Sequence, residues 1–250
     1  MPSKKTLLIF DIDSTLTKFD SCLFTYKYTL GEEAYNKAVE LAKVENWVES
    51  FNRLYELLKE KNKNFNDVKE AIEHIEINEG FIELLNYLNS NKEKFDVIAI
   101  SSGYYNQIEY LLKFNNIFDK FDAILCIKSE LLSNGLVKAF YKEKEHNCKL
   151  CNACQCKTVE YNEYLKNKEN CYEKTIFICD GLSDFCLAKN LNENDVVMPR
   201  KNFSFYNKYK LININFNYYY YLILKKTILL KIFDKKKLLL NAIKKNIIYF

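Results

Sequence analysis

Near its start the chain reads Thr6-Leu7-Leu8-Ile9-Phe10-Asp11-Ile12-Asp13-Ser14-Thr15, an apolar run that stops abruptly at two carboxylates. The same pattern recurs where Val97–Ile100 precedes Ser101 and where Thr175–Cys179 precedes Asp180. Short runs rich in Ile and Val, bounded by polar residues, are typical of buried strands in a parallel sheet. The sequence therefore predicts three such strands, each with polar residues at its carboxyl end.

Two weaker apolar runs, Ala123–Ile127 and Val196–Met198, add further candidate strands. Apolar residues at helical spacing lie between the strand candidates, in Phe81–Leu88 and in Tyr104–Phe114. Strands that alternate with helices favour an α/β fold whose strands are joined by crossovers. We therefore predict an α/β fold with a Rossmann-like parallel sheet.

The segment 21–79 has no strand-like run, and we predict that it is helical throughout. Glu32–Glu60 carries its apolar residues in roughly one helical stripe, and Phe65–Ile77 gives another helix. We expect a small helical cap domain inserted after the first strand and facing its carboxyl end. Extra helices packed on the sheet are the alternative. The α/β core then comprises 1–20 and 80–201.

Residues 202–250 form a tail drawn almost entirely from Phe, Leu, Ile, Tyr, Asn and Lys. These are largely the residues that A/T-only codons encode, so we expect a low-complexity basic and apolar extension without a catalytic part. Removing 211–250 should then leave catalysis intact. Lysines interrupt the apolar run, which makes a transmembrane helix a poor fit. A basic interfacial helix that touches a membrane is the alternative.

Composition narrows the class of protein. Of the 250 residues 48% are apolar and 28% charged, which excludes a wholly disordered chain. A net charge of +4 is too small to imply nucleic acid, and we expect no nucleic-acid partner. The first apolar run is too short for a secretory signal, so we expect a cytoplasmic location. In that reducing compartment we expect the nine cysteines to be free, metal-bound or redox-active rather than joined in disulfides.

Ligands of parallel α/β sheets bind at the carboxyl ends of the strands. We therefore expect Asp11, Asp13, Ser101, Asp180 and Asp184 to converge on one site. Four carboxylates cannot all remain ionised at short range without a cation, because each raises the pKa of the others. Oxygen ligands with room for a phosphate favour Mg²⁺.

Three motifs resemble those of the haloacid dehalogenase superfamily of phosphatases. The stretch Leu7–Thr15 is similar to the first motif, D-x-D-x-T after an apolar strand, and Val97–Ser101 to the second. Cys179-Asp180-Gly181-Leu182-Ser183-Asp184 resembles the fourth, G-D-G-x-x-D, with Cys in place of the first Gly. The resemblance spans most of residues 6–200. It implies the haloacid dehalogenase fold and a phosphatase that hydrolyses a small phosphorylated metabolite.

The resemblance also implies roles for individual residues. Asp11 would be the nucleophile that forms an aspartyl-phosphate, and Asp13 would act as the general acid and base. Phosphate would be bound by Ser101 and Ser102, with Thr15 fixing the loop. The ligands of Mg²⁺ would be Asp11, the Asp13 backbone carbonyl, Asp180 and Asp184.

A cysteine cluster narrows the resemblance further. His146-x-Cys148-x2-Cys151-x4-Cys156-Lys157 resembles H-x-C-x2-C-x4-C-K of the phosphoethanolamine/phosphocholine phosphatases and their pyridoxal phosphate phosphatase relatives. Asp180-Gly181-x2-Asp184-Phe185-Cys186 is similar to a second motif of that family, with Ser183 in place of Asn. In that family the lysine after the last cysteine is the third-motif residue, so the resemblance assigns a catalytic role to Lys157.

Two departures from the family pattern bear on substrate and metal. Ser102 stands where that family has an acidic residue able to pair with a cationic amine, so phosphoserine or pyridoxal phosphate is an alternative to phosphocholine and phosphoethanolamine. Cys154 adds a thiol to the cluster. A structural Zn²⁺ could be bound by Cys148, Cys151 and Cys156 with His146 or Cys154. Free thiols and a disulfide remain the other interpretations.

A different class of function is a catalytically inactive scaffold whose zinc knuckle binds RNA or protein. The cysteine cluster and the lysine-rich tail favour it. The complete acidic set argues against it.

Overall fold

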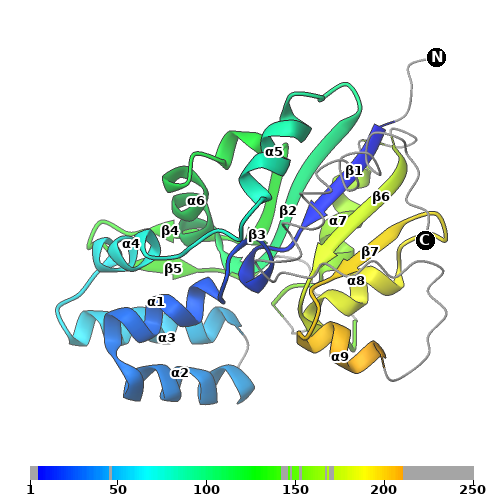
Figure 1. The fold of residues 1–250 in the computed structure, drawn as a ribbon. Helices are drawn as coiled ribbons and strands as arrows, with labels where there is room; N and C mark the ends of the chain where they lie inside the picture. The colour runs from blue at the N-terminus through cyan, green and yellow to red at the C-terminus, as the bar shows by residue number, and fades with distance from the viewer. Residues whose placement is uncertain are drawn as a thin grey trace.

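A computed structural model of the chain describes residues 5–44, 47–141, 146, 148–151, 154–166, 168 and 172–210. Its centre is a five-stranded sheet in the order β3-β2-β1-β6-β7, and every pairing in it is parallel (Figure 1). The strands are β1 (Lys5–Phe10), β2 (Phe95–Tyr104), β3 (Ala123–Ile127), β6 (Tyr172–Cys179) and β7 (Val196–Pro199). All five predicted strands and the α/β class are confirmed.

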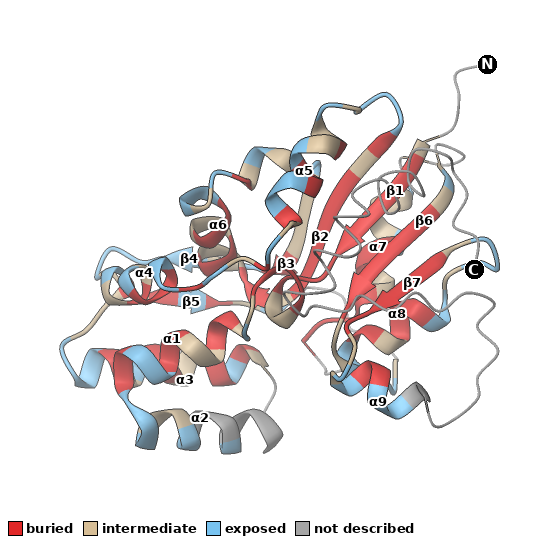
Figure 2. Ribbon diagram, in the orientation of Figure 1, coloured by how far each residue is buried: buried red, intermediate tan, exposed pale blue. Residues whose placement is uncertain are grey.

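Strand β1 is buried on both faces because helices cover both sides of the sheet (Figure 2). Leu8 and Phe10 belong to one apolar core, which includes residues of α5 (Phe81–Asn89) and α6 (Tyr105–Phe114). Leu7 and Ile9 point the other way, into a second core. That core draws on α7 (Lys157–Leu165), α8 (Phe185–Lys189) and α9 (Ser204–Lys210). Asp11, which follows β1, therefore lies at the centre of the sheet, between the two layers of helices that cover its faces.

Four helices, α1 to α4, lie beyond the carboxyl end of β1 (Figure 1). They are α1 (Ser21–Leu30), α2 (Glu32–Val44), α3 (Trp47–Glu60) and α4 (Phe65–Glu73). The prediction of one continuous helical stripe over residues 32–60 is wrong in one respect. Two helices, α2 and α3, occupy this stretch and pack against each other.

A two-stranded antiparallel hairpin, β4 (Ser129–Leu131) and β5 (Val137–Ala139), was not anticipated from the sequence. Strands of three residues give too little alternation to be recognised. The hairpin packs on α3, where the Asn52 side chain accepts from the Ala139 N–H at 2.8 Å and donates to its carbonyl at 3.1 Å. This contact ties a segment that follows β3 to the helices that follow β1.

The start of the predicted tail is part of the folded core. Phe205 in α9 is 1% exposed, and its ring lies 6.2 Å from that of Phe185. Its N–H also donates to the Asp180 carbonyl at 3.0 Å. The predictions for 211–250 lie outside the described residues. Across the described ranges, no helix combines the length and apolar character needed to cross a bilayer.

Candidate active site

Strand β1 lies at the switch point of the sheet, with β2 on one side and β6 on the other. Loops from adjacent strands diverge at such a point and leave a crevice at the carboxyl edge. Asp11 follows β1, Ser101 lies in the last part of β2 and Asp180 follows β6. The expected convergence of these three segments is therefore built into the strand order.

The turn after β1 is held in shape by two residues distant in sequence. The side-chain amide of Asn78 donates to the carbonyls of Thr15 and Thr17, at 2.7 and 2.8 Å. Arg200 donates to the carbonyl of Ser14 from the other side. Backbone carbonyls buried in a turn need such donors. No sequence signal points to Asn78, because its partners lie some sixty residues earlier in the chain.

Lys157, the first residue of α7, lies between two carboxylates. Its Nζ is 2.6 Å from Asp11 Oδ1 and 2.5 Å from Asp184 Oδ1, and all three side chains are at most 7% exposed. Burial opposes the ammonium charge, but the two carboxylates outweigh it and raise the pKa of Lys157. Burial and the negative charges of Asp184 and Asp180 raise the pKa of Asp11, while Lys157 acts in the opposite direction.

The loop after β6 brings Asp180 to the same place. Asp184 Oδ2 accepts the Gly181 N–H at 2.8 Å and the Asp180 N–H at 3.2 Å, which fixes the loop. Thr15 Oγ1 donates to Asp180 Oδ1 at 3.2 Å. Burial and the neighbouring Asp184 raise the pKa of Asp180 to about 6.

These carboxylates fit a hard cation. One oxygen from each of Asp11, Asp180 and Asp184 lies within 4.8 Å of the others. Three ionised carboxylates set against one lysine leave two negative charges in excess, and oxygen ligands with such an excess suit Mg²⁺. The Asp13 carboxylate is not part of this group.

Asp13 instead turns toward the helices beyond the sheet. Its Oδ1 accepts from the N–H of Ser21 at 2.8 Å and from the Ser21 hydroxyl. Its Oδ2 accepts from the Ser101 hydroxyl at 3.2 Å. Ser101 Oγ also accepts the Gly103 N–H at 3.0 Å, so this predicted phosphate-binding hydroxyl already has two partners.

A cavity of about 210 Å³ opens at these groups. Asp11, Asp13, Lys157 and Asp180 line it, as do the predicted Ser102 and the aromatic Trp47 and Phe51 of α3. Asp20 also lines it, and sequence reasoning missed this residue. Burial and the charge of Asp13 raise the pKa of Asp20 to about 7. The only sequence signal for Asp20 was its position as the N-cap of α1, where it accepts the Leu23 N–H at 2.8 Å.

A larger hollow of about 730 Å³ lies near the amino ends of β6 and β7, where Lys174 and Asp195 line it. It contains none of the converging carboxylates, so volume alone does not identify the site.

The predicted zinc ligands separate into two groups. Cys148, Cys151 and Cys156 come together, whereas Cys154 is buried elsewhere and His146 is not among the grouped residues. A fourth thiol joins the three from α8, that of Cys186.

The sheet order and the site together define the class of haloacid dehalogenase-type phosphatases. Solved structures with this fold include a phospho-aspartyl intermediate analogue of phosphoserine phosphatase. It has a TM-score of 0.55 and 19% sequence identity, and the match covers 82% of this chain and 91% of that one. This likeness confirms the predicted fold.

The family model described as "Putative Phosphatase" matches residues 6–219, so the chain belongs to this family. The pyridoxal phosphate phosphatase PHOSPHO2 of Bos taurus is 29% identical over 204 residues, which are 80% of this chain and 84% of the relative. The phosphoethanolamine/phosphocholine phosphatase of Gallus gallus is 26% identical over 205 residues, 81% of this chain and 76% of the relative. The protein is a phosphoric monoester hydrolase, and the alternative of an inactive scaffold is not retained.

Proposed function

We propose that the protein is a Mg²⁺-dependent phosphatase that hydrolyses a small phosphomonoester through an aspartyl-phosphate on Asp11. The observation that carries the proposal is the position of Lys157, whose Nζ contacts Asp11 and Asp184 at the wall of a cavity. A structural neighbour that represents a phospho-aspartyl intermediate analogue supports the same chemistry.

Asp11 is suited to be the nucleophile. A carboxylate attacks phosphorus only when ionised, and Lys157 favours that form against the burial that opposes it. In the first step an Asp11 oxygen forms a bond to phosphorus while the ester P–O bond breaks. Lys157 offsets the negative charge that gathers on Asp11 and the transferring phosphoryl group.

Asp13 is suited to move the proton. It lines the cavity beside Asp11, and Ser21 and Ser101 fix the orientation of its carboxyl group. In the first step Asp13 donates a proton to the leaving alkoxide. In the second step it takes a proton from the water that cleaves the aspartyl-phosphate, which returns both residues to their starting forms.

Mg²⁺ would be held by Asp11, Asp180 and Asp184, with the Asp13 backbone carbonyl as a further ligand. When bound, the ion neutralises the excess negative charge of the carboxylates and of the phosphate. Thr15 supports the arrangement because its hydroxyl donates to Asp180.

Residues 21–79 act as a cap that limits the substrate to a small molecule. The cavity has a volume of about 210 Å³ and is walled by Trp47 and Phe51 from this segment. Ser102 offers no charge to a cationic amine, but Asp20 places a carboxyl group in the same cavity. Phosphocholine, phosphoethanolamine, phosphoserine and pyridoxal phosphate are therefore the substrates to compare. Two of the relatives are named for substrates in this set.

The two aspartates can be distinguished with two kinds of substrate. An aryl phosphate has a good leaving group that needs little protonation, whereas an alkyl phosphate depends on a general acid. Asp11→Asn should abolish turnover of both. Asp13→Asn should reduce turnover of alkyl phosphates by about 10²–10⁴-fold and of aryl phosphates by much less.

Turnover would be measured with Mg²⁺ present and with Mg²⁺ omitted, and circular dichroism would confirm that each variant is folded. A folded Asp11→Asn variant with full activity would disprove the nucleophile assignment. Equal losses on both kinds of substrate would remove Asp13 from the role of general acid. Full activity without any divalent ion would contradict the metal assignment.

A further inference from the structure

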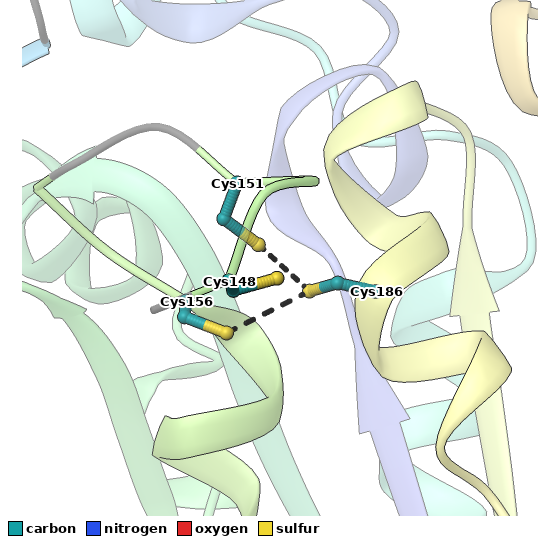
Figure 3. Close-up of side chains that lie close together, drawn as sticks. All are labelled: Cys148, Cys151, Cys156 and Cys186. Carbon is teal, nitrogen blue, oxygen red and sulfur yellow. Dashed lines mark hydrogen bonds between the residues drawn. The ribbon is translucent and has the colours of Figure 1, made fainter. Parts of the chain in front are cut away.

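Four cysteine side chains converge at the side of the sheet covered by α7 and α8 (Figure 3). Cys148 and Cys151 come from the loop before α7, and Cys156 is the N-cap of α7. Cys186 lies in α8, thirty residues later in the sequence. Their sulfur atoms all lie within 4.8 Å of one another, and Cys156 and Cys186 are buried.

The four sulfurs lie close enough together to bind one metal ion between them. Four thiolates at about 2.3 Å from one ion stand about 3.8 Å apart. The sulfur of Cys186 lies 2.9 Å from that of Cys151 and 4.0 Å from that of Cys156, which brackets this value. We propose that Cys148, Cys151, Cys156 and Cys186 form a structural Zn²⁺ site that joins the loop before α7 to α8.

Convergence of all four thiols favours a bound metal over a disulfide or a set of free thiols. A disulfide would use only two of them and would leave a second pair of sulfurs crowded against it without a role. Cys22 and Cys179, among the described cysteines, are buried outside this group. Zinc with four thiolates, by contrast, uses every member of the group and is the common closed site for this ligand set.

The surroundings suit thiolates. Cys156 is the N-cap of α7, so it lies at the end of that helix where the first backbone N–H groups have no partner within the helix. Backbone donors at a helix N-terminus offset part of the negative charge that four thiolates place on a zinc ion. The loop before α7 contributes few apolar side chains of its own, and a metal compensates for such a deficit.

The site adjoins two residues that the proposed function uses. Cys156 is followed directly by Lys157, and Cys186 lies two residues after Asp184. A metal bound to both cysteines would therefore fix the two segments whose side chains meet at 2.5 Å. This consequence for catalysis rests on the proposed function, whereas the metal site itself does not.

The metal can be identified on the full-length protein, purified under reducing conditions without added metal. Elemental analysis should find one zinc per chain. Replacing the zinc with Co²⁺ should give the intense sulfur-to-cobalt charge-transfer absorption of a tetrahedral thiolate site. Alkylation followed by mass spectrometry should show the half-exposed Cys148 and Cys151 protected with zinc bound and modified after a zinc-selective chelator removes it.

Variants then assign the ligands. Cys186→Ser should lose the zinc, whereas the matched control Cys154→Ala should keep it, because Cys154 is buried outside the group. Cys148→His should keep the zinc, since histidine is also a zinc ligand, whereas Cys148→Ala should lose the zinc and show a lower kcat in excess Mg²⁺. If Cys186→Ser does not fold, three measurements on the unsubstituted protein still test whether the four cysteines bind zinc. These are the zinc stoichiometry, the cobalt spectrum and the alkylation pattern.

Several results would overturn the proposal. These are less than stoichiometric zinc, another metal in its place, a disulfide between any two of the four cysteines, and retention of zinc by a folded Cys186→Ser variant. Loss of zinc without loss of activity would leave the metal site standing and remove its link to Lys157. Loss of activity on Asp11→Asn with zinc unchanged would separate the proposed function from this site.

Discussion

Replacing Lys157 with methionine removes the only cation placed, among the described residues, between Asp11 and Asp184. Methionine keeps the length and most of the volume of the side chain, so the change removes charge more than packing. The Nζ of Lys157 makes contacts of 2.6 and 2.5 Å to the two carboxylates, and its side chain is 3% exposed. Two buried carboxylates then lose their shared partner.

The decrease in the free energy of unfolding that we expect for Lys157→Met follows from this geometry. Breaking a buried ion pair by removing one partner destabilises a protein by about 3–5 kcal/mol, and one lysine here serves two carboxylates. A total stability of about 5–15 kcal/mol leaves the variant folded but much weakened. Lys168→Met is the matched control: its Nζ lies 3.6 Å from Asp96, its side chain is 35% exposed, and such surface pairs contribute about 0–1 kcal/mol.

The loss of stability caused by Lys157→Met should also depend on pH. Burial and the charges of Asp184 and Asp180 already raise the pKa of Asp11, and Lys157 is the group that opposes them. Without Lys157 the folded state holds the Asp11 proton more tightly than the unfolded chain does. The free energy of unfolding of the variant should therefore fall as the pH rises from about 4 to neutral, and more steeply than that of the unmodified protein.

Urea unfolding in Mg²⁺-free buffer, followed by the fluorescence of Trp47, measures the stability of both variants. Turnover in Mg²⁺ should fall by at least about 10²–10³-fold in Lys157→Met, because a charge at the reacting phosphoryl group is lost. The reasoning fails if Lys157→Met unfolds at the same urea concentration as Lys168→Met. It also fails if folded Lys157→Met retains turnover within tenfold of the unmodified enzyme.

Three further predictions concern the edges of the site. Deleting 211–250 should leave turnover unchanged, whereas deleting 203–250 should reduce both turnover and the thermal midpoint, because burial of Phe205 contributes about 1.5–3 kcal/mol; equal behaviour of the two truncations would contradict this. Asn78→Ala should lower the free energy of unfolding, measured in urea, by about 3 kcal/mol, since two buried carbonyls lose their donor. A decrease below about 0.5 kcal/mol would argue against this role of Asn78. In Mg²⁺-free protein the pKa of Asp180 is about 6, above its value in the unfolded chain, so stability falls as the pH rises through that range. Mg²⁺ should therefore raise the thermal midpoint more at neutral pH than at about pH 5, and an equal gain at both would refute this.

The strands and the acidic residues could be predicted because their signals are local. Each apolar run carries its own boundary in the polar residue that follows it, as Asp11 follows Phe10 and Asp180 follows Cys179. Once the runs are taken as parallel strands, sheet geometry alone brings their carboxyl ends together. The resemblance to a known family then added Lys157, which no periodicity could have selected from the other lysines.

The residues that were missed act across long sequence separations. Asn78 supports a turn that lies some sixty residues earlier, and Cys186 joins three cysteines that lie thirty residues or more before it. In a sequence, Cys186 is simply a small apolar residue on a short helix, and Asp20 is a helix cap. Only the packing of α8 beside the loop before α7, and the position of α1 beyond the carboxyl end of β1, reveal what these side chains meet.

The contacts of Asp13 suggest how the two parts of the molecule are coupled. Asp11 directly follows β1 and is held by Lys157, the first residue of α7, which packs on the sheet. Asp13 is held by Ser21, the first residue of α1, and by Ser101 at the end of β2. A movement of α1 therefore acts on Asp13 and leaves the surroundings of Asp11 in place. The nucleophile is thus built into the rigid sheet, while the orientation of the group proposed to move the proton depends on the helices that enclose the substrate.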